Sequence, residues 1–229
     1  KTELITNVSH DIKTPLTSII NYVDLLKREN IQDPKIQGYL DILEAKAQRL
    51  KHLTEDVVEA SKISSGNITM EYMNINFVEM INQTTGEFTE KFEKRNLQIV
   101  LNVPEKPVMV RTDGRRMWRV IENIYNNAAK YALEGTRVYA NLIEKEHTVE
   151  FSLKNISEQP LNISADELTE RFIRGDVSRS TEGSGLGLSI AKNLTELQGG
   201  KFELYLDGDL FKVTIVFPKA VVGQSVTKP

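Results

Sequence analysis

The chain has 229 residues, of which 29 are basic and 32 acidic, giving a formal net charge of −3 at pH 7. This balance does not suggest a broad nucleic-acid-binding face. The absence of cysteine excludes disulfides and thiolate metal sites. His10, His52 and His147 are too scattered to suggest a metal cluster, and no apolar run approaches the roughly 20 residues of a membrane span. Because the chain starts at Lys1 and not at a methionine, we expect it to be part of a longer protein.

Apolar residues in the first 65 positions recur at alternating spacings of three and four, the pattern of a helix that packs along one seam. We expect a first helix over residues 1–29, a turn at NIQDP (30–34), and a second helix that ends at SSGN (64–67). Pro34 suits the start of the second helix. Two helices alone cannot cover both seams, so we expect a homodimer with a four-helix bundle.

After Gly66 the chain changes to short alternating runs and helical patterns. Strands are predicted over residues 68–75, 97–103, 136–143, 149–156 and 211–217, and helices over 77–95, 114–133, 165–172 and 187–198. Because these elements lack regular βαβ alternation, the predicted fold class is α+β, with a mixed or antiparallel sheet under helices in a sandwich. The predicted domains are residues 1–65 and 66–229.

The segment NVSHDIKTPLTSII (7–20) places an ionisable ring on the first helix, roughly 165° from the centre of the apolar seam. Thr14 shares this outer face with His10. An exposed imidazole is largely neutral at pH 7 and hence nucleophilic, and the carboxylate of Asp11 could hold its second ring proton. Pro15 removes a helical hydrogen bond to the Asp11 carbonyl, so we expect a bendable turn here. An ordinary surface histidine is the alternative.

The string SHDIKTPLTSI resembles the phosphoacceptor motif of sensor histidine kinases, and the hairpin resembles that family's dimerisation and histidine-phosphotransfer domain. The resemblance implies that His10 is phosphorylated and that Asp11 is the general base that activates it. It also implies that Thr14 positions a water for removing phosphate from a partner protein.

The run RVIENIYNNAAKYA (119–132) predicts a helix with Asn123 and Asn127 on one face. Amide oxygens suit Mg²⁺ and Lys130 suits a phosphate, whereas ordinary helix-surface amides are the alternative. The run resembles the asparagine-rich helix of the histidine-kinase ATP-binding domain, which is shared with gyrase, Hsp90 and MutL. This implies Asn127 as the principal Mg²⁺ ligand, Asn123 as a helper, Lys130 near phosphate, and Tyr131 near the adenine or ribose.

In GSGLGLSIAK (183–192), three glycines directly precede an amphipathic helix. Glycines let backbone N–H groups approach a phosphate, and a helix N-terminus adds about half a positive charge. The string resembles the second glycine box of the same family. It implies that Gly183, Gly185, Leu186 and Gly187 contact the nucleotide.

The polar stretch 174–182 before this box predicts a mobile lid, with Arg174 and Arg179 as candidate phosphate contacts or, alternatively, as ordinary solvated loop charges. The family's usual Asp-x-Gly-x-Gly is altered: Asn155 replaces the aspartate that binds the adenine amino group, and Ser157 replaces the first glycine. An asparagine oxygen still accepts from that amine, but the loss of charge should weaken binding by about 1 kcal/mol.

The resemblance spans almost the whole chain and implies a sensor histidine kinase core that uses ATP and Mg²⁺. Such a core autophosphorylates His10, passes the phosphoryl group to an aspartate of a response-regulator receiver domain, and acts as a phosphatase toward that regulator. It also implies a homodimer in the cytoplasmic portion of a membrane-anchored bacterial sensor, with no nucleic acid and no membrane contact from this segment. Asn155 leaves open a degenerate signalling scaffold that binds ATP weakly. An ATPase-driven clamp would not need the HDxxTP helix.

Overall fold

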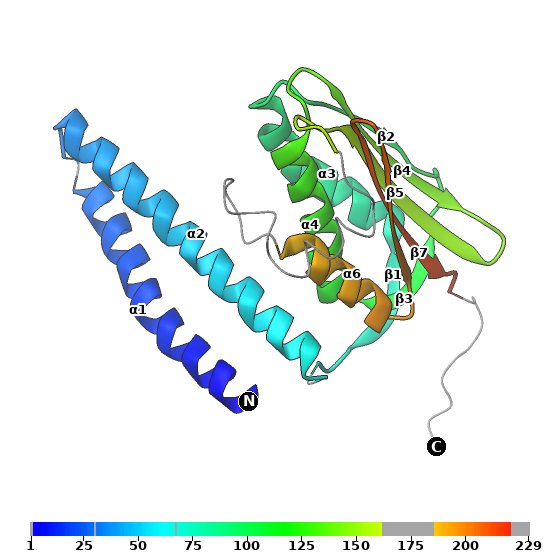
Figure 1. Ribbon diagram of the computed structural model, residues 1–229, viewed down its shortest axis with the longest axis horizontal. Coiled ribbons are helices and arrows are strands. Elements are labelled where there is room, and N and C mark those ends of the chain that lie inside the picture. The colour runs from blue at the N-terminus through cyan, green and yellow to red at the C-terminus, as the bar shows by residue number, and fades with distance from the viewer. Residues whose placement is uncertain (1, 30, 67, 162–185, 221–229) are drawn as a thin grey trace. The chain divides into compact units, whose positions relative to one another are not determined.

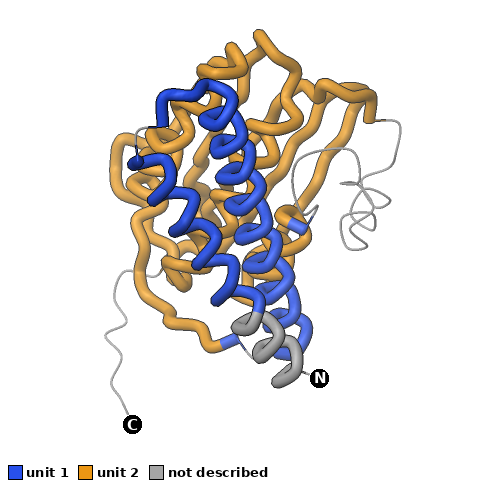
Figure 2. The backbone as a smooth tube through the Cα atoms, turned by 90° about the vertical axis from the view of Figure 1, so that its left-hand side faces the viewer, with its two compact units in different colours: residues 1–68, 175–186 blue, residues 69–174, 187–229 orange. Residues whose placement is uncertain are grey.

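The computed structural model of the chain describes residues 2–29, 31–66, 68–161 and 186–220, with the backbone alone for residues 2–11 (Figure 1). The chain divides into two compact units, one built on the residues up to 68 and the other beginning at residue 69 (Figure 2). Within the described ranges, no helix combines the length and the apolar character needed to cross a bilayer.

The first unit is a helical hairpin of α1 (Thr2–Arg28) and α2 (Pro34–Ser64), which confirms the predicted fold of this part. The α1 helix continues through Pro15. Asp33 caps the start of α2, because its side chain accepts a hydrogen bond from the Lys35 N–H at 2.8 Å and Pro34 occupies the first helical position. The turn between the helices is therefore set by local sequence.

The two helices of the hairpin contact each other along part of their apolar seams. Leu16 and Val23 on α1 and Leu40 and Ala47 on α2 are buried. Seven further seam residues are exposed in the single chain, namely Ile12, Ile19, Leu26, Ile36, Leu43, Leu50 and Val57, whereas Leu53 and Ala60 are half-buried. One hairpin therefore leaves about half of its apolar seam uncovered.

The second unit contains β1 (Tyr72–Asn76), α3 (Phe77–Glu93), β2 (Gln98–Asn102), β3 (Met109–Asp113), α4 (Gly114–Tyr131), β4 (Arg137–Glu144), β5 (Thr148–Ile156), α6 (Gly187–Leu197), β6 (Lys201–Asp207) and β7 (Leu210–Pro218). A five-stranded sheet has the order β2-β4-β5-β7-β6, with β2 and β4 parallel and the other pairs antiparallel. The strands β1 and β3 form a separate antiparallel pair. The mixed sheet confirms the α+β prediction.

Two strands, β3 and β6, are absent from the prediction, and β1 begins at Tyr72 and not at residue 68. The β3 strand is only five residues long and its burial does not alternate, so it carries little periodic signal. The β6 sequence, KFELYLD, does alternate between polar and apolar residues and was readable as a strand. The predicted helix over 165–172 lies outside the described residues.

The helices α3, α4 and α6 all cover one face of the five-stranded sheet (Figure 1). Alternate residues of the central strands point into this layer, including Phe151 and Leu153 on β5. The ring of Tyr125 on α4 stacks on Phe151 with centroids 6.2 Å apart. Burial raises the pKa of Tyr125 to about 12, although a hydrogen bond with the Thr85 hydroxyl at 2.8 Å opposes the shift.

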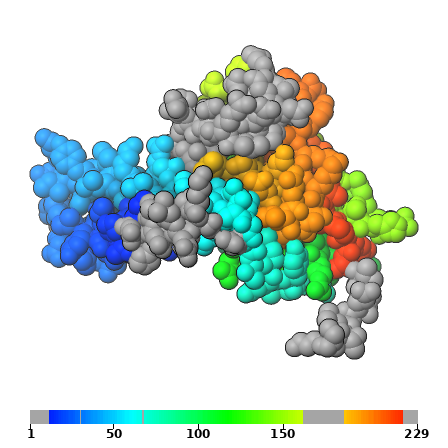
Figure 3. All heavy atoms as spheres, turned by 60° about the horizontal axis from the view of Figure 1, so that its bottom comes forward, coloured from blue at the N-terminus to red at the C-terminus, as the bar shows by residue number. Residues whose placement is uncertain are grey.

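The turn of the β4–β5 hairpin (light green) projects beside the end of β7 (red) in Figure 3. There the backbone N–H of Lys219 donates to the His147 carbonyl at 2.9 Å. The opposite end of β5, where the chain returns toward α4, is the end that carries the site described next.

Candidate nucleotide site

The start of α4 is fixed by Asp113, whose two carboxylate oxygens accept from the backbone N–H groups of Arg116, at 3.0 Å, and Glu71, at 2.9 Å. Burial alone would raise the pKa of Asp113, but these hydrogen bonds outweigh it and hold the pKa below its ordinary value. The cap links α4 to the chain entering β1. It therefore fixes the helix that carries the asparagines.

The polar face of α4 carries the predicted amides and lysine. Asn123 is buried, with 7% of its surface exposed, whereas Asn127 and Lys130 are half-buried. The Lys130 ammonium lies 4.7 Å from the ring centroid of Tyr131. Asn127 is therefore the more accessible of the two amides, while Asn123 lies beneath the surface.

The N-terminus of α6 meets this face directly. A Cβ atom built on Gly187, the first residue of α6, would lie 3.3 Å from Asn123 Oδ1. Leu186, immediately before the helix, is half-buried. The structure thus brings together Asn123 and the last glycine of the predicted glycine box, which the sequence placed in two separate motifs.

The other end of α6 is held by Gln198, a residue that the sequence did not single out. Its side-chain oxygen accepts from the Thr112 hydroxyl and from the Asp113 N–H, the latter at 3.0 Å, while its Nε2 donates to the Leu194 carbonyl at 2.8 Å. Because Asp113 also caps α4, this buried glutamine connects the end of α6 to the start of α4. No residue pattern in the sequence pointed to it.

Asn155, near the end of β5, is 3% exposed and faces the helices. Its Nδ2 donates to the Ile156 carbonyl at 3.1 Å, while its Oδ1 has no hydrogen-bond partner among the described residues. Asn123 Nδ2 is likewise buried without a partner in the described part of the chain. Buried polar atoms are usually paired, so each of these two atoms is a candidate contact for a polar ligand.

Backbone hydrogen bonds bring the end of β5 to the end of α4. The Leu133 N–H donates to the Ile156 carbonyl, and the Glu158 N–H donates to the Tyr131 carbonyl, both at 2.8 Å. These bonds hold the end of the strand that carries Asn155 against the segment that contains Tyr131. The predicted adenine-binding residues therefore lie in neighbouring segments.

Arg95 closes the C-terminal end of α4. Its guanidinium donates to the carbonyls of Ala129 at 2.9 Å and Lys130 at 2.6 Å, and it forms a 3.0 Å ion pair with Glu158. A cation here satisfies carbonyls that lack helical partners and complements the helix dipole. From the sequence, Arg95 could be placed only at the end of a predicted helix, because the residues that it contacts are distant in the chain.

The remaining predicted residues fall in three groups. His10 and Asp11 lie on α1, in the part described by backbone alone. Thr14 is exposed on the same helix, and its carbonyl accepts from the Ser18 hydroxyl at 3.3 Å. Arg174, Arg179, Gly183 and Gly185 lie outside the described residues.

No group of three or more histidine, aspartate or glutamate side chains in the described ranges could hold a metal ion. A cation at this site would find amide oxygens there, and the phosphates of a bound nucleotide would add oxygens of their own; Mg²⁺ accepts both kinds of ligand. The reachable amide of Asn127 fits this ligand preference.

The chain begins with a helical hairpin that carries a His-Asp pair. A sandwich follows, in which the amide-bearing helix α4 faces a glycine at the start of α6. This combination is that of a phospho-acceptor domain joined to an ATPase-type domain. Residues 1–66 match the His Kinase A (phospho-acceptor) domain family. Residues 112–221 match the histidine kinase-, DNA gyrase B- and HSP90-like ATPase family. The chain belongs to the two-component sensor histidine kinases and corresponds to their catalytic portion.

Comparison with known proteins supports the same assignment. The chain is 31% identical over 222 residues to the sensor protein VanSC of Enterococcus gallinarum, covering 96% of this chain and 61% of that protein. It therefore spans about three fifths of the length of this relative. The fold is similar to full-length ShkA in complex with AMPPNP, with a TM-score of 0.80 and 19% identity over 99% of this chain and 48% of that one.

A second structural relative is the histidine kinase ThkA, solved in complex with the response regulator protein TrrA. The TM-score is 0.63 and the identity 22%, covering 95% of this chain and 61% of that one. At this identity the likeness concerns the fold of both domains.

Proposed function

We propose that the chain binds ATP in the second unit, transfers its γ-phosphoryl group to His10, and passes that group to an aspartate of a response-regulator receiver domain. The observation that carries the nucleotide site concerns two buried atoms that have no hydrogen-bond partner among the described residues: Asn123 Nδ2, beside the start of α6, and Asn155 Oδ1, near the end of α4. The AMPPNP complex of the similarly folded ShkA supports the assignment.

Asn155 gives this site a base preference. Its Nδ2 donates to the Ile156 carbonyl, and its Oδ1 accepts no hydrogen bond from the part of the chain that the structure describes, so Oδ1 is available as a fixed acceptor. Adenine presents an amino group that can donate to such an acceptor, whereas guanine presents a carbonyl oxygen at the corresponding position. Asn155 therefore selects an adenine nucleotide despite replacing the aspartate of its relatives, and Tyr131 lies in the adjoining segment for contact with the base or ribose.

The phosphate end of the site uses α4 and the glycine box. Lys130 is the cation for a phosphate, and Asn127, with Asn123 as a helper, supplies amide oxygens for Mg²⁺. Bound Mg²⁺ would neutralise phosphate charge during transfer. The backbone of Gly183, Gly185, Leu186 and Gly187 contributes N–H groups at a helix N-terminus. Arg174 and Arg179 are further candidate phosphate contacts.

The chemistry is a phosphoryl transfer onto nitrogen. A ring nitrogen of His10 forms a bond to the γ-phosphorus, the bond from that phosphorus to the β–γ bridging oxygen breaks, and ADP leaves. Asp11 accepts the proton from the other ring nitrogen. A receiver aspartate then takes the phosphoryl group, and Thr14 positions water for its later hydrolysis. The ThkA–TrrA complex supports a response regulator as the partner.

The hairpin is proposed to dimerise. Its uncovered apolar residues lie along the same predicted seams as the buried ones, and a second hairpin would bury them in a four-helix bundle. Because the relatives are sensor proteins longer than this chain, we also propose that it forms the cytoplasmic portion of a membrane-anchored sensor.

Incubation of the purified chain with radiolabelled Mg-ATP tests the proposal. Acid-labile label on the parent chain, absent from His10→Gln and Asn127→Ala variants, is the expected result. Label on His10→Gln would refute the assignment of the phosphorylated residue. Separate measurement of AMPPNP binding distinguishes a kinase from the second candidate, a scaffold with a weakened nucleotide site, which the Asn155 replacement motivates.

A further inference from the structure

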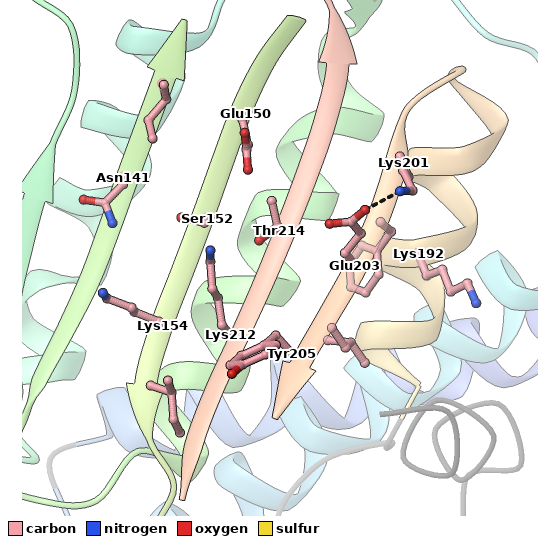
Figure 4. A pocket seen from close by; sticks show the side chains of 14 residues that line it. Asn141, Glu150, Ser152, Lys154, Lys192, Lys201, Glu203, Tyr205, Lys212 and Thr214 are labelled. Carbon is pink, nitrogen blue, oxygen red and sulfur yellow. Dashed lines mark ion pairs between the residues drawn. The ribbon is translucent and has the colours of Figure 1, made fainter. Parts of the chain in front are cut away.

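The face of the five-stranded sheet that points away from α3, α4 and α6 carries two rows of polar side chains. In the first row, Lys154 on β5 lies directly opposite Lys212 on β7, with Tyr139 and Tyr205 on the flanking strands. The second row contains Asn141, Ser152, Thr214 and Glu203. These two rows are here named the outer sheet face. All of their residues except Tyr139 line a concavity of about 780 Å³ (Figure 4).

The acidic residues at this face are already engaged. Glu150 forms an ion pair with Lys145, and Glu203 forms one with Lys201, the pair joined by a dashed line in Figure 4. Asp207, at the end of β6, accepts a hydrogen bond from the tyrosine two residues before it at 3.3 Å. None of these carboxylates forms an ion pair with Lys154 or Lys212, the two lysines in the middle of the first row.

Lys154 and Lys212 therefore leave the centre of the face positive. Neither lysine forms an ion pair with any residue that the structure describes, and the Lys154 ammonium lies 5.1 Å from the ring centroid of Tyr139. Like charges directly opposite each other on neighbouring strands repel. An anion placed between the two lysines would remove this repulsion, so the face has a defined charge preference.

The floor beside the lysines offers hydrogen-bond donors. Ser152 is 7% exposed and Thr214 is 5% exposed, and the two lie opposite each other in the second row. Their hydroxyls make no hydrogen bond to the described residues, although each can donate one. The face thus combines two unpaired cations with two recessed hydroxyl groups.

We propose that the outer sheet face binds an acidic segment of a partner protein in extended conformation. Strands lie about 4.8 Å apart, so the row from Tyr139 to Tyr205 is about 14 Å long, which is the length of about four extended residues. Carboxylates of the segment meet Lys154 and Lys212, its backbone carbonyls accept from the floor hydroxyls, and the tyrosines pack against its aliphatic stems. The site is on the opposite face of the sheet from Asn155 and does not rest on the proposed nucleotide binding.

Binding of a fluorescein-labelled hexaglutamate peptide to the whole chain tests the proposal, by anisotropy at low salt and by amide chemical shifts. Lys154→Gln and Lys212→Gln are each expected to weaken binding about threefold to fivefold, and the double variant more. Lys106→Gln, which removes an exposed lysine between β2 and β3, is the matched control, and Asn127→Ala tests independence from the nucleotide site. Circular dichroism confirms that each variant is folded.

The proposal holds if the amides of Ser152 and Thr214 shift on titration and only the two face lysines affect affinity. Equal weakening by Lys106→Gln overturns it, because the attraction would then be general. Binding of inorganic pyrophosphate at this face, with no detectable hexaglutamate binding, also overturns it by showing a small-anion site. Loss of binding in Asn127→Ala would place the peptide at the nucleotide site and likewise refute the proposal.

Discussion

Gly187, the first residue of α6, faces Asn123 on α4 so closely that a Cβ atom added to the glycine would lie 3.3 Å from the asparagine side-chain oxygen. Asn123 is buried at this point, so it has little freedom to move aside. The close approach of the start of α6 to α4 at this point therefore depends on the absence of a side chain at Gly187.

Replacing Gly187 with alanine should disturb the site more than the fold. Alanine favours the helix, but its methyl group presses on Asn123, which must shift by a few tenths of an ångström. We expect the Kd for AMPPNP, measured by calorimetry, to rise about fivefold with little change in Tm. Gly86→Ala is the control, since Gly86 is exposed in α3 with nothing within 4 Å; it should stabilise the chain by about 0.5–1 kcal/mol and leave Kd unchanged. Equal Kd values for the two variants would contradict this reading.

Replacing Asn155 with aspartate should move stability and affinity in opposite directions. The variant loses the donor to the Ile156 carbonyl and buries a charge, so the ligand-free chain should unfold at a lower temperature. A carboxylate accepts more strongly from the adenine amine, so AMPPNP should bind about fivefold more tightly, the equivalent of ~1 kcal/mol. Calorimetry measures the affinity for AMPPNP, and thermal unfolding measures the stability of the ligand-free chain. Weaker binding by Asn155→Asp would show that this atom does not face the base.

Removing the Arg95 side chain should destabilise the second unit. Its charged hydrogen bonds to Ala129 and Lys130 hold the end of α4, and such bonds contribute about 1.5–3 kcal/mol. Urea unfolding of Arg95→Ala measures this loss. Lys94→Ala, which removes only an exposed pair with Glu90, is the matched control and should change stability by less than about 0.5 kcal/mol. A similar loss in both variants would argue against the cap.

Acid should unfold the second unit partly through Asp113. Because the folded-state pKa of Asp113 is below its ordinary value, its ionised form stabilises the fold. This stabilisation is fully present above the unfolded-state pKa of about 3.9 and is lost as pH falls through the folded-state value. Asp113→Asn should therefore cost about 1 kcal/mol at pH 7, with the difference from the parent shrinking below about pH 4. Urea titrations at several pH values measure it; a constant difference would contradict the linkage.

The sequence predicted the helical hairpin, the α+β class and most of the strands because these depend on local periodicity. The turn between α1 and α2 is predictable because Asp33 caps the second helix with its side chain and Pro34 is favoured at the first helical position. The β3 strand was missed because its five residues are extended through their pairing with β1, which is a tertiary contact and not a local sequence preference.

Within the candidate site, the sequence named Asn123, Gly187 and Asn155, but it did not show that Asn123 lies against the start of α6. The supports, Arg95 and Gln198, could not be predicted, because each acts on backbone groups far away in the chain. A buried glutamine and a helix-terminal arginine look like ordinary residues until the segments they join are known. Resemblance to a family finds the residues proposed to touch the nucleotide more readily than the residues that hold the surrounding helices in place.

The position of β7 has a consequence for biosynthesis. This strand follows every other strand of its sheet in the sequence, yet it lies between β5 and β6. A nascent chain that ends before residue 210 therefore exposes an unpaired edge on β5, the strand that carries Asn155, and leaves β6 without its neighbour. The phospho-acceptor hairpin is translated first and can fold from local contacts, whereas the sheet beneath the nucleotide site is completed only when β7 leaves the ribosome.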